Sequence, residues 1–265
     1  MNIPASRWYL AIEKRRSRRR YIEENLKSSQ LKRIQSLCND FQPFPSARAV
    51  LVKESPDDVF KGIIGSYGLI RGAKSFIAFI GNVRSPYVQE QVGYTGEGIM
   101  LQAEVMNLNT CWVGGFFRRD MVSSLVDMEK NEQVFAITPI GYAVEEPTFG
   151  EKLITGFGWT HKRKPLSKMV IGLKDTEWPE WMKSSLQAAR LAPSAVNRQP
   201  WRFIADEKSI TVAVNDKSLK RETQISKRLD CGIAMLHIEV AALNSGISGH
   251  WEFLDPPGVA RFNVY

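Results

Sequence analysis

The chain has 265 residues, of which 43% are hydrophobic and 24% are charged, and its formal net charge is +8. This length allows one large domain or two small ones, and the composition is typical of a globular protein. The longest apolar run, residues 76–80, is much shorter than the roughly 20 residues that cross a bilayer. No apolar signal core precedes the first basic residues, so we expect a cytoplasmic protein.

Cysteine and histidine are too sparse to indicate a disulfide framework or a metal centre. The chain has three cysteines and three histidines, which are widely spaced and include no CxxC pair. Such spacing predicts neither disulfide bridges nor a zinc site. We therefore expect no bound metal.

The first helical pattern is followed by a block of positive charge. Pro4 opens a helix in which Trp8 and Ile12 share a face. Six of the seven residues 14–20 are then lysine or arginine. Such a block could bind nucleic acid, form a solvated helix end or hold the phosphate of a cofactor. No interleaved aromatic residues and no nucleic-acid-binding signature accompany it, which disfavours the first interpretation.

Apolar periodicity, prolines and glycines predict the elements that follow. Three glycines near the start of the longest helix favour close helix packing over a phosphate loop, because the order of a dinucleotide fingerprint is absent. In chain order the predicted elements are a helix over 26–39, strands over 49–52 and 76–80, a helix over 87–109, an extended piece over 110–116, a strand over 134–144 and a loop over 147–165.

A second cycle of elements begins after residues 169–172. Its predicted elements are a helix over 181–191, a loop over 193–201, strands at Phe203 and over 210–214, and a helix over 225–244. Residues 235–244 can be laid on residues 100–109 at a constant offset of 135, with six identities in ten positions. This match indicates a degenerate internal duplication; the alternative is a chance likeness between two amphipathic helices.

Residues 192–203 form the most informative segment, with the sequence APSAVNRQPWRF. Its two prolines fix φ and end the preceding helix, so the polar side chains between them lie on a stiff loop. Ser194, Asn197 and Gln199 can each donate and accept hydrogen bonds, which suits the edge of a neutral heteroaromatic ring. An ordinary helix-to-strand turn would have the same residue types.

Four motifs resemble those of the nitroreductase family of FMN-dependent oxidoreductases. Residues 15–21, RRSRRRY, resemble its opening Arg-Arg-Ser-x-Arg motif, and residues 192–203 are similar to its Ala-Pro-Ser-x-x-Asn-x-Gln-Pro-Trp loop. Residues 112–116 resemble the segment beneath the flavin ring. Residues 141–142, followed by residues 163–166, resemble the closing strand and basic tail.

The order of these motifs departs from that of ordinary family members. Those members place the Pro-Ser loop a few dozen residues after the Arg-Ser motif, whereas 177 positions separate Ser17 from Ser194 in this chain. Ordinary members are homodimers in which each flavin lies between the subunits. The resemblance therefore implies that two subunit equivalents are fused, as in the internally duplicated branch described as "Putative TM nitroreductase".

The resemblance implies an α+β, nitroreductase-like fold, with mixed sheets flanked by helices and two halves that form a pseudo-dimer within one chain. Residues 1–170 would supply the arginines that bind the FMN phosphate, and residues 171–265 would supply the flavin loop. No second Arg-Ser motif opens the later half, and residues 44–50, FPSARAV, lack the Asn and the Gln-Pro-Trp of the loop. One FMN per chain is therefore expected, and the fused interface makes a monomer feasible.

Each candidate site residue follows from its position in a matching motif. Guanidinium groups bind phosphate oxygens, while glycine lets backbone N–H groups approach the flavin ring near N5. No side chain is assigned to acid–base catalysis, because flavin chemistry chiefly needs positioning. The residues implied to bind FMN are Arg16, Ser17, Arg19, Val113, Gly114, Gly115, His161, Arg163, Pro193, Ser194, Ala195 and Asn197.

The implied activity is that of an FMN-dependent oxidoreductase. NADH or NADPH would reduce the flavin and leave, and a nitroaromatic, a quinone or a similar flat small molecule would then take the electrons. Two other functions stay open: a flavin-binding protein with little turnover, and a nucleic-acid-binding protein that uses the basic block at residues 14–20.

Overall fold

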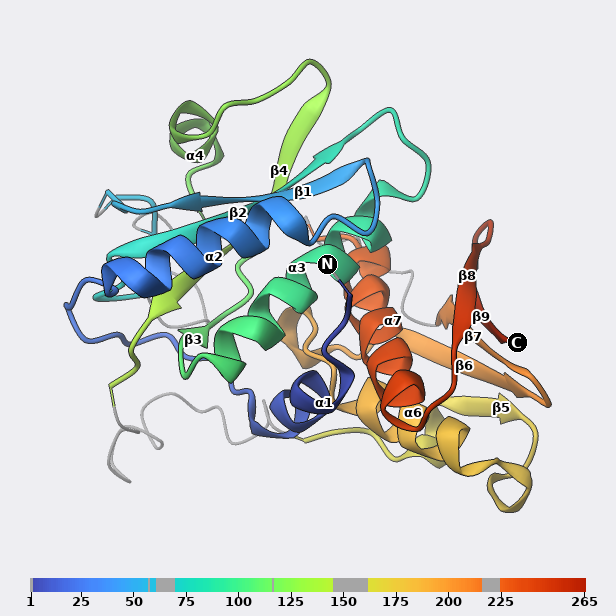
Figure 1. Cartoon of the computed structure of the whole chain (residues 1–265). Helices are drawn as coiled ribbons and strands as arrows, with labels where there is room; N and C mark the ends of the chain where they lie inside the picture. Colours follow the sequence, from blue (N-terminus) through green and yellow to red (C-terminus); the bar gives the residue numbers. More distant parts are fainter. Residues whose placement is uncertain (1, 57, 61–69, 116, 145–161, 216–224) are drawn as a thin grey trace.

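The computed structural model describes residues 2–56, 58–60, 70–115, 117–144, 162–215 and 225–265. Two separate sheets stand on either side of a group of helices (Figure 1). This arrangement confirms the expected α+β fold with sheets flanked by helices. One large hydrophobic core extends from the first sheet through the helices to the second.

The first sheet is antiparallel and has the order β1-β2-β4-β3. Its central strand β2 is buried on both faces, because successive side chains of a strand point to opposite sides. Ile77 and Phe79 enter the main core, whereas Phe76 and Ile80 face a smaller core. The elements of this part are β1 (Ala47–Val52), β2 (Ser75–Asn82), β3 (Asn109–Thr110), β4 (Glu132–Gly141) and the short helix α4 (Arg119–Leu125), which contributes to the smaller core.

The second sheet is mixed and has the order β5-β6-β7-β9-β8. β5 and β6 run parallel, and the other neighbouring strands are antiparallel. The strands are β5 (Val170–Gly172), β6 (Trp201–Asp206), β7 (Ser209–Val214), β8 (Gly249–Phe253) and β9 (Gly258–Val264). The first sheet thus takes its strands from residues 47–141 and the second from residues 170–264.

Two long helices, α3 and α7, lie side by side in the centre of the molecule (Figure 1). Helices α1 and α6 pack against α7, and α2 packs against β1. The helices are α1 (Ala5–Lys14), α2 (Ser28–Asp40), α3 (Val88–Val105), α6 (Glu180–Leu191) and α7 (Lys227–Asn244), with short 3-10 turns η1 (Leu166–Lys168), η2 (Asp175–Glu177) and η3 (Ala195–Asn197). Among the described helices, none is long and apolar enough to cross a membrane.

Glycines allow α3 and α7 to cross in close contact. A Cβ atom at Gly93 would stand 2.1 Å from the carbonyl oxygen of Leu229, and one at Gly232 would stand 2.0 Å from that of Glu90. Both distances are far below an ordinary contact, so any side chain at these positions would push the helix backbones apart. The expectation that glycines serve helix packing therefore holds for Gly93.

The two central helices correspond to each other at a constant offset of 139. Both are 18 residues long, their crossing glycines are Gly93 and Gly232, and both end in the same hydrogen-bonded turn. In that turn the residue two positions beyond the helix cap, Leu108 or Ile247, donates to a carbonyl five residues earlier. The sequence comparison used an offset of 135, which is wrong by about one helical turn.

Several boundaries differ from the sequence-based expectation. α3 ends at Val105, before residue 109, because Asn107 adopts a left-handed φ of 56° and turns the chain into β3. The strand expected over 134–144 is β4, which ends at Gly141. The sequence did not indicate α4, β5, β8 or β9 as elements. α4 buries a single side chain, and β8 has no fully buried position, so neither carries a strong apolar pattern.

Candidate functional site

The Arg-Ser motif runs along the β3 edge of the first sheet after α1 ends. Ser17 forms a parallel bridge with Thr110, and the Arg18 N–H donates to the Thr110 carbonyl at 3.0 Å. The Arg19 carbonyl accepts from the Arg71 N–H at 3.0 Å. The backbone of this basic segment is thus fixed by the sheet, and its side chains are held beside residues 110–112.

Arg15 is the arginine of this motif that turns inward. Its side chain is 5% exposed, and its Nε lies 3.5 Å from Oε1 of Glu97 in α3. Arg15 was absent from the residues expected to bind FMN, which began at Arg16. Its position three residues after Ile12 continues the buried face of α1, and that periodicity was the signal that could have singled it out.

Arg16, which the motif implies as an FMN ligand, contacts the end of α1 in the structure. It is exposed, and its Nη1 donates to the carbonyls of Glu13 at 2.7 Å and Arg15 at 2.9 Å, at the end of α1. These are carbonyls that a helix C-terminus leaves without intrahelical partners. Arg16 therefore caps α1, although its charge still acts on the neighbouring Arg163.

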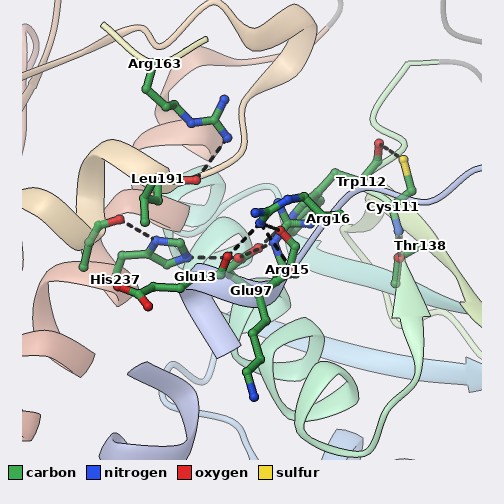
Figure 2. Close-up of polar contacts among 12 residues, drawn as sticks. Glu13, Arg15, Arg16, Glu97, Cys111, Trp112, Thr138, Arg163, Leu191 and His237 are labelled. Carbon is green, nitrogen blue, oxygen red and sulfur yellow. Dashed lines mark hydrogen bonds and ion pairs between the residues drawn. The ribbon is translucent and has the colours of Figure 1, made fainter. Parts of the chain in front are cut away.

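Glu97 collects three donors from different elements, as Figure 2 shows. It accepts from Trp112 Nε1 at 2.7 Å, contacts His237 Nε2 of α7 at 3.0 Å and pairs with Arg15. Burial acts to raise the pKa of Glu97, but Arg15 and the hydrogen bonds from His237 and Trp112 hold that pKa below its ordinary value. Glu97 is therefore a fully buried carboxylate.

Arg163 joins the basic tail to the Pro-Ser loop. Its Nη1 donates to Asn197 Oδ1 at 2.7 Å, and its Nη2 donates to the Leu191 carbonyl at 3.1 Å. Burial lowers the pKa of Arg163 to about 10, with smaller contributions from the charges of Arg15, Arg16 and Arg190. Three further guanidinium groups thus lie close enough to Arg163 for their charges to act on it; we call Arg15, Arg16, Arg163 and Arg190 the arginine cluster.

Three members of the arginine cluster have buried N–H groups without a partner. Arg15 Nη1, Arg163 Nε and Arg190 Nε have no hydrogen-bond partner within the described parts of the chain. Buried donors are nearly always satisfied in proteins, and a buried unpaired donor on a cation is especially costly. The oxygens of an anion are the acceptors that such donors prefer, so the residue types of the cluster suit a phosphate group such as that of FMN.

A hydrogen bond within the Pro-Ser loop helps to fix its conformation. Ser194 Oγ accepts from the Gln199 N–H at 2.9 Å, so this hydroxyl braces the loop itself. Val196, Asn197 and Gln199 have φ values of 51°, 52° and 48°, which is strained for side-chain-bearing residues. The structure thus holds an unusual backbone, which an ordinary helix-to-strand turn would not need.

Asp230, at the start of α7, holds this loop in place. Its Oδ1 accepts from the Ala195 N–H at 3.1 Å, and its Oδ2 accepts from Arg198 Nε at 2.6 Å. Arg198 also donates to the carbonyls of Ile225 at 3.0 Å and Ser226 at 2.8 Å. Burial raises the pKa of Asp230 to about 6, partly offset by Arg198 and the Ala195 N–H.

Residues 113–115 lie close to Ile225, just before α7, and Ile225 in turn contacts the Pro-Ser loop. Val113 is buried and pairs with Ile137 by two backbone hydrogen bonds of 2.9 Å. A Cβ atom at Gly114 would stand 3.1 Å from the Ile225 side chain, next to the carbonyl that binds Arg198. The structure therefore brings the Gly114 segment and the Pro-Ser loop to the same end of α7.

The structure places the expected phosphate-binding residues in different ways. Arg163 and Asn197 are in direct contact, and Arg16 adds charge beside them. Ser17 and Arg19 lie along the sheet edge, where their backbones are paired. His161 lies outside the described residues. Arg15, Glu97, Arg190 and His237 were not expected from the sequence.

Known proteins resemble this chain in sequence and in fold. A Mycobacterium tuberculosis protein described as "Putative NAD(P)H nitroreductase acg" is 33% identical over 79 residues, which are 29% of this chain and 24% of that protein. The crystal structure of a "putative nitroreductase" from Thermotoga maritima has a TM-score of 0.65 at 18% identity, covering 97% of this chain and 93% of its own. A nitroreductase family protein from Clostridium difficile 630 covers 63% of this chain and 96% of its own, with 20% identity and a TM-score of 0.45.

The Mycobacterium tuberculosis match spans only about a quarter of that relative's length. The Thermotoga maritima likeness extends over nearly the whole of both chains and shows a shared fold. A sequence model of the family described as "Putative TM nitroreductase" matches residues 8–242. Because this match covers most of the chain, the protein belongs to that nitroreductase family.

Proposed function

We propose that this protein is an FMN-dependent NAD(P)H oxidoreductase that reduces nitroaromatics, quinones or similar flat acceptors. Its membership of the nitroreductase family supports a flavin-dependent oxidoreductase. The observation that carries the proposal is the arginine cluster, whose three buried N–H groups lack partners among the described residues. A phosphate dianion would supply acceptors for such donors and would relieve the repulsion between the arginines.

Residues from both parts of the chain would hold the phosphate. Arg15 and Arg163, within residues 1–170, and Arg190, within residues 171–265, carry the unpaired donors. Ser17 and Arg19 follow Arg15 along the sheet edge and would contribute from there, as their motif implies. In this proposal the two ranges act as the fused halves of a pseudo-dimer, with the flavin between them.

The ring of the flavin would lie between the Gly114 segment and the Pro-Ser loop. Val113, Gly114 and Gly115 would face it from one side, and residues 193–197 from the other. When bound, FMN would take a hydride at N5 from NADH or NADPH and deliver electrons to the acceptor after the nucleotide leaves. The chain's own contribution is to orient the cofactor with hydrogen bonds and positive charge.

One FMN per chain is part of the proposal, because the chain has one Arg-Ser motif and one complete Pro-Ser loop, and Glu239, the other Trp-bonded glutamate of the central helices, has different partners. Trp251 donates to Glu239 at 2.7 Å, as Trp112 does to Glu97, and Tyr94 donates to the same carboxylate at 2.7 Å. No arginine takes the place of Arg15 in the described contacts of Glu239. Aromatic rings surround this region: Phe44 packs edge to face on Tyr94 and Phe253, and Phe253 stacks on Tyr87.

Binding of FMN and of riboflavin to the apoprotein tests this proposal. We expect Arg15→Ala to weaken FMN binding on the order of 10- to 100-fold, because a hydrogen-bonded charge is lost. Riboflavin has no phosphate, so its affinity should be unchanged. The exposed Arg33→Ala serves as the matched control. Equal FMN affinity of Arg15→Ala and the parent protein would remove the proposed phosphate site.

Anaerobic reduction distinguishes the proposed enzyme from the alternative, a flavin-binding protein with little turnover. NADH or NADPH should bleach the bound flavin, and a quinone or nitrofuran added afterwards should restore its colour. Failure of both nucleotides to bleach a correctly loaded protein would favour the binder over the enzyme.

A further inference from the structure

Glu97 and His237 form a buried pair that neither the family motifs nor the flavin chemistry explains. Glu97 is 0% exposed and His237 is 1% exposed, and their contact joins α3 to α7 across the centre of the molecule (Figure 2). Burying charged groups is costly unless each is well paired. The charge balance of the pair therefore includes Arg15, whose Nε lies near the same carboxylate.

The hydrogen bonds of His237 fix the number of protons on this pair. Nδ1 lies 2.9 Å from the Ala188 carbonyl, which can only accept, so Nδ1 carries a hydrogen. Nε2 lies 3.0 Å from Glu97 Oε1. A bare imidazole nitrogen facing a carboxylate would place two acceptors against each other, so a second proton must lie between them.

That proton makes the pair neutral as a whole. The Glu97 carboxylate and the His237 imidazolium cancel, and the same holds if the proton sits on Glu97. Without it, the negative charge of Glu97 would largely neutralise Arg15, whose Nε is 3.5 Å away. With it, Arg15 keeps its full positive charge while remaining fixed to the carboxylate.

We propose that Glu97 and His237 are positioning residues for the phosphate of FMN: Glu97 orients Arg15, and the shared proton preserves the positive charge that Arg15 offers to the phosphate. This inference rests on the proposed FMN site. The same two residues also contact the segments that carry the other parts of the proposed site, the Gly114 segment and the helix of Arg190. Glu97 holds Trp112, two residues before Gly114, and His237 holds Ala188 in the helix that carries Arg190.

Other charges around the pair agree with this role. Arg16 and Arg163 add positive charge beside Arg15. Glu104, two turns along α3 from Glu97, is a further carboxylate near the basic block, and its Oε2 is buried without a partner among the described residues. A charge on Glu97 without a proton-bearing partner would add to the negative charge that Glu104 already places near Arg15, and the shared proton avoids this addition.

The test compares FMN with riboflavin on apoproteins that differ at these two positions. His237→Gln keeps a hydrogen-bond donor for Glu97 but removes the positive charge, so Glu97 should neutralise Arg15. We expect FMN affinity to fall on the order of tenfold, with riboflavin affinity within about twofold of the parent protein. In the double variant Glu97→Gln/His237→Gln the carboxylate is also gone, and most of the lost FMN affinity should return.

This recovery separates the proposal from a merely structural role. A structural role would make the double variant worse than His237→Gln, and would lower FMN and riboflavin affinity together; either result would overturn the inference. If His237→Gln fails to fold, His237→Asn, which also removes the cation, takes its place with the same expected loss for FMN and not for riboflavin. His250→Gln, at an exposed position, is the matched control.

The same binding measurements distinguish a failure of the FMN proposal from a failure of the inference about the pair. If the parent protein binds neither FMN nor riboflavin, the FMN proposal itself fails. If the parent binds FMN and Arg15→Ala loses it, but His237→Gln binds FMN as the parent does, only the inference about the Glu97–His237 pair fails.

Discussion

Arg163 donates a hydrogen bond from Nη1 to Asn197 Oδ1 at 2.7 Å, and this contact joins the basic segment after the first sheet to the loop before β6. The same guanidinium donates to the carbonyl of Leu191, the last residue of α6. One side chain therefore sets both the position of the Pro-Ser loop and one side of the arginine cluster. The Asn197 amide also donates to the Lys162 carbonyl at 2.9 Å, so the two segments are bound together from both directions.

Arg163→Lys should weaken FMN binding although it keeps the charge. A lysine ammonium lacks the planar fork with which Arg163 donates to Asn197 and Leu191 at once while leaving Nε for an anion. We expect a loss on the order of tenfold or more in FMN affinity. Titration of the apoprotein with FMN, followed by flavin fluorescence, measures it. Unchanged affinity in Arg163→Lys would show that the fork geometry is not used.

Gly232→Ala should destabilise the whole protein. A Cβ atom there would stand 2.0 Å from the Glu90 carbonyl oxygen, so the two central helices would have to move apart. We expect the free energy of unfolding to fall by about 2 kcal/mol or more, as for other overpacked cores. Urea unfolding measures the change, with the exposed Ser245→Ala at the end of α7 as the control. Equal stability of the two variants would contradict the tight crossing.

Asp230 should make folding stability fall between about pH 4 and pH 6. Burial raises its pKa in the folded state to about 6, above the ordinary value of 3.8. The folded protein therefore binds this proton more tightly than the unfolded chain, and the stabilising contribution, complete below pH 4, is lost as the pH rises to 6. The loss is at most about 3 kcal/mol.

The comparison with Asp230→Asn isolates this effect from the other titrating groups. The stability of the parent protein relative to Asp230→Asn should decline across this pH range and become constant above it. A difference that stays flat, or that grows with pH, would mean that Arg198 keeps Asp230 ionised in the folded state.

Fully loaded protein should contain one FMN per chain. The chain has one Arg-Ser motif, and Glu239, which accepts from Trp251 and Tyr94, has no arginine among its described contacts. Flavin absorbance after release by heat, divided by protein concentration, gives the ratio. A ratio near two would show that the chain holds a second flavin site.

Much of the fold followed from the sequence because its elements have strong local patterns. The long helices, the strands β1, β2, β4, β6 and β7, and the stiff loop between two prolines all depend on periodicity and on backbone restriction. The sequence did not predict the elements that have a weak apolar pattern, such as α4 and β8. The internal duplication was detected at an offset of 135 when the structural correspondence is 139. A shift of four residues is about one helical turn and leaves the apolar face almost unchanged, so sequence periodicity cannot separate the two.

The sequence by itself determined that a basic motif at one end of the chain and a polar loop at the other resemble two parts of one flavin site. It could not decide which arginine turns inward, because six of the seven residues 14–20 are basic and any of them can carry charge. The tertiary structure selected Arg15 by placing it on the buried face of α1, against Glu97. It also brought His237 to Glu97 across 140 positions of sequence, a contact that only the packing of α3 against α7 creates.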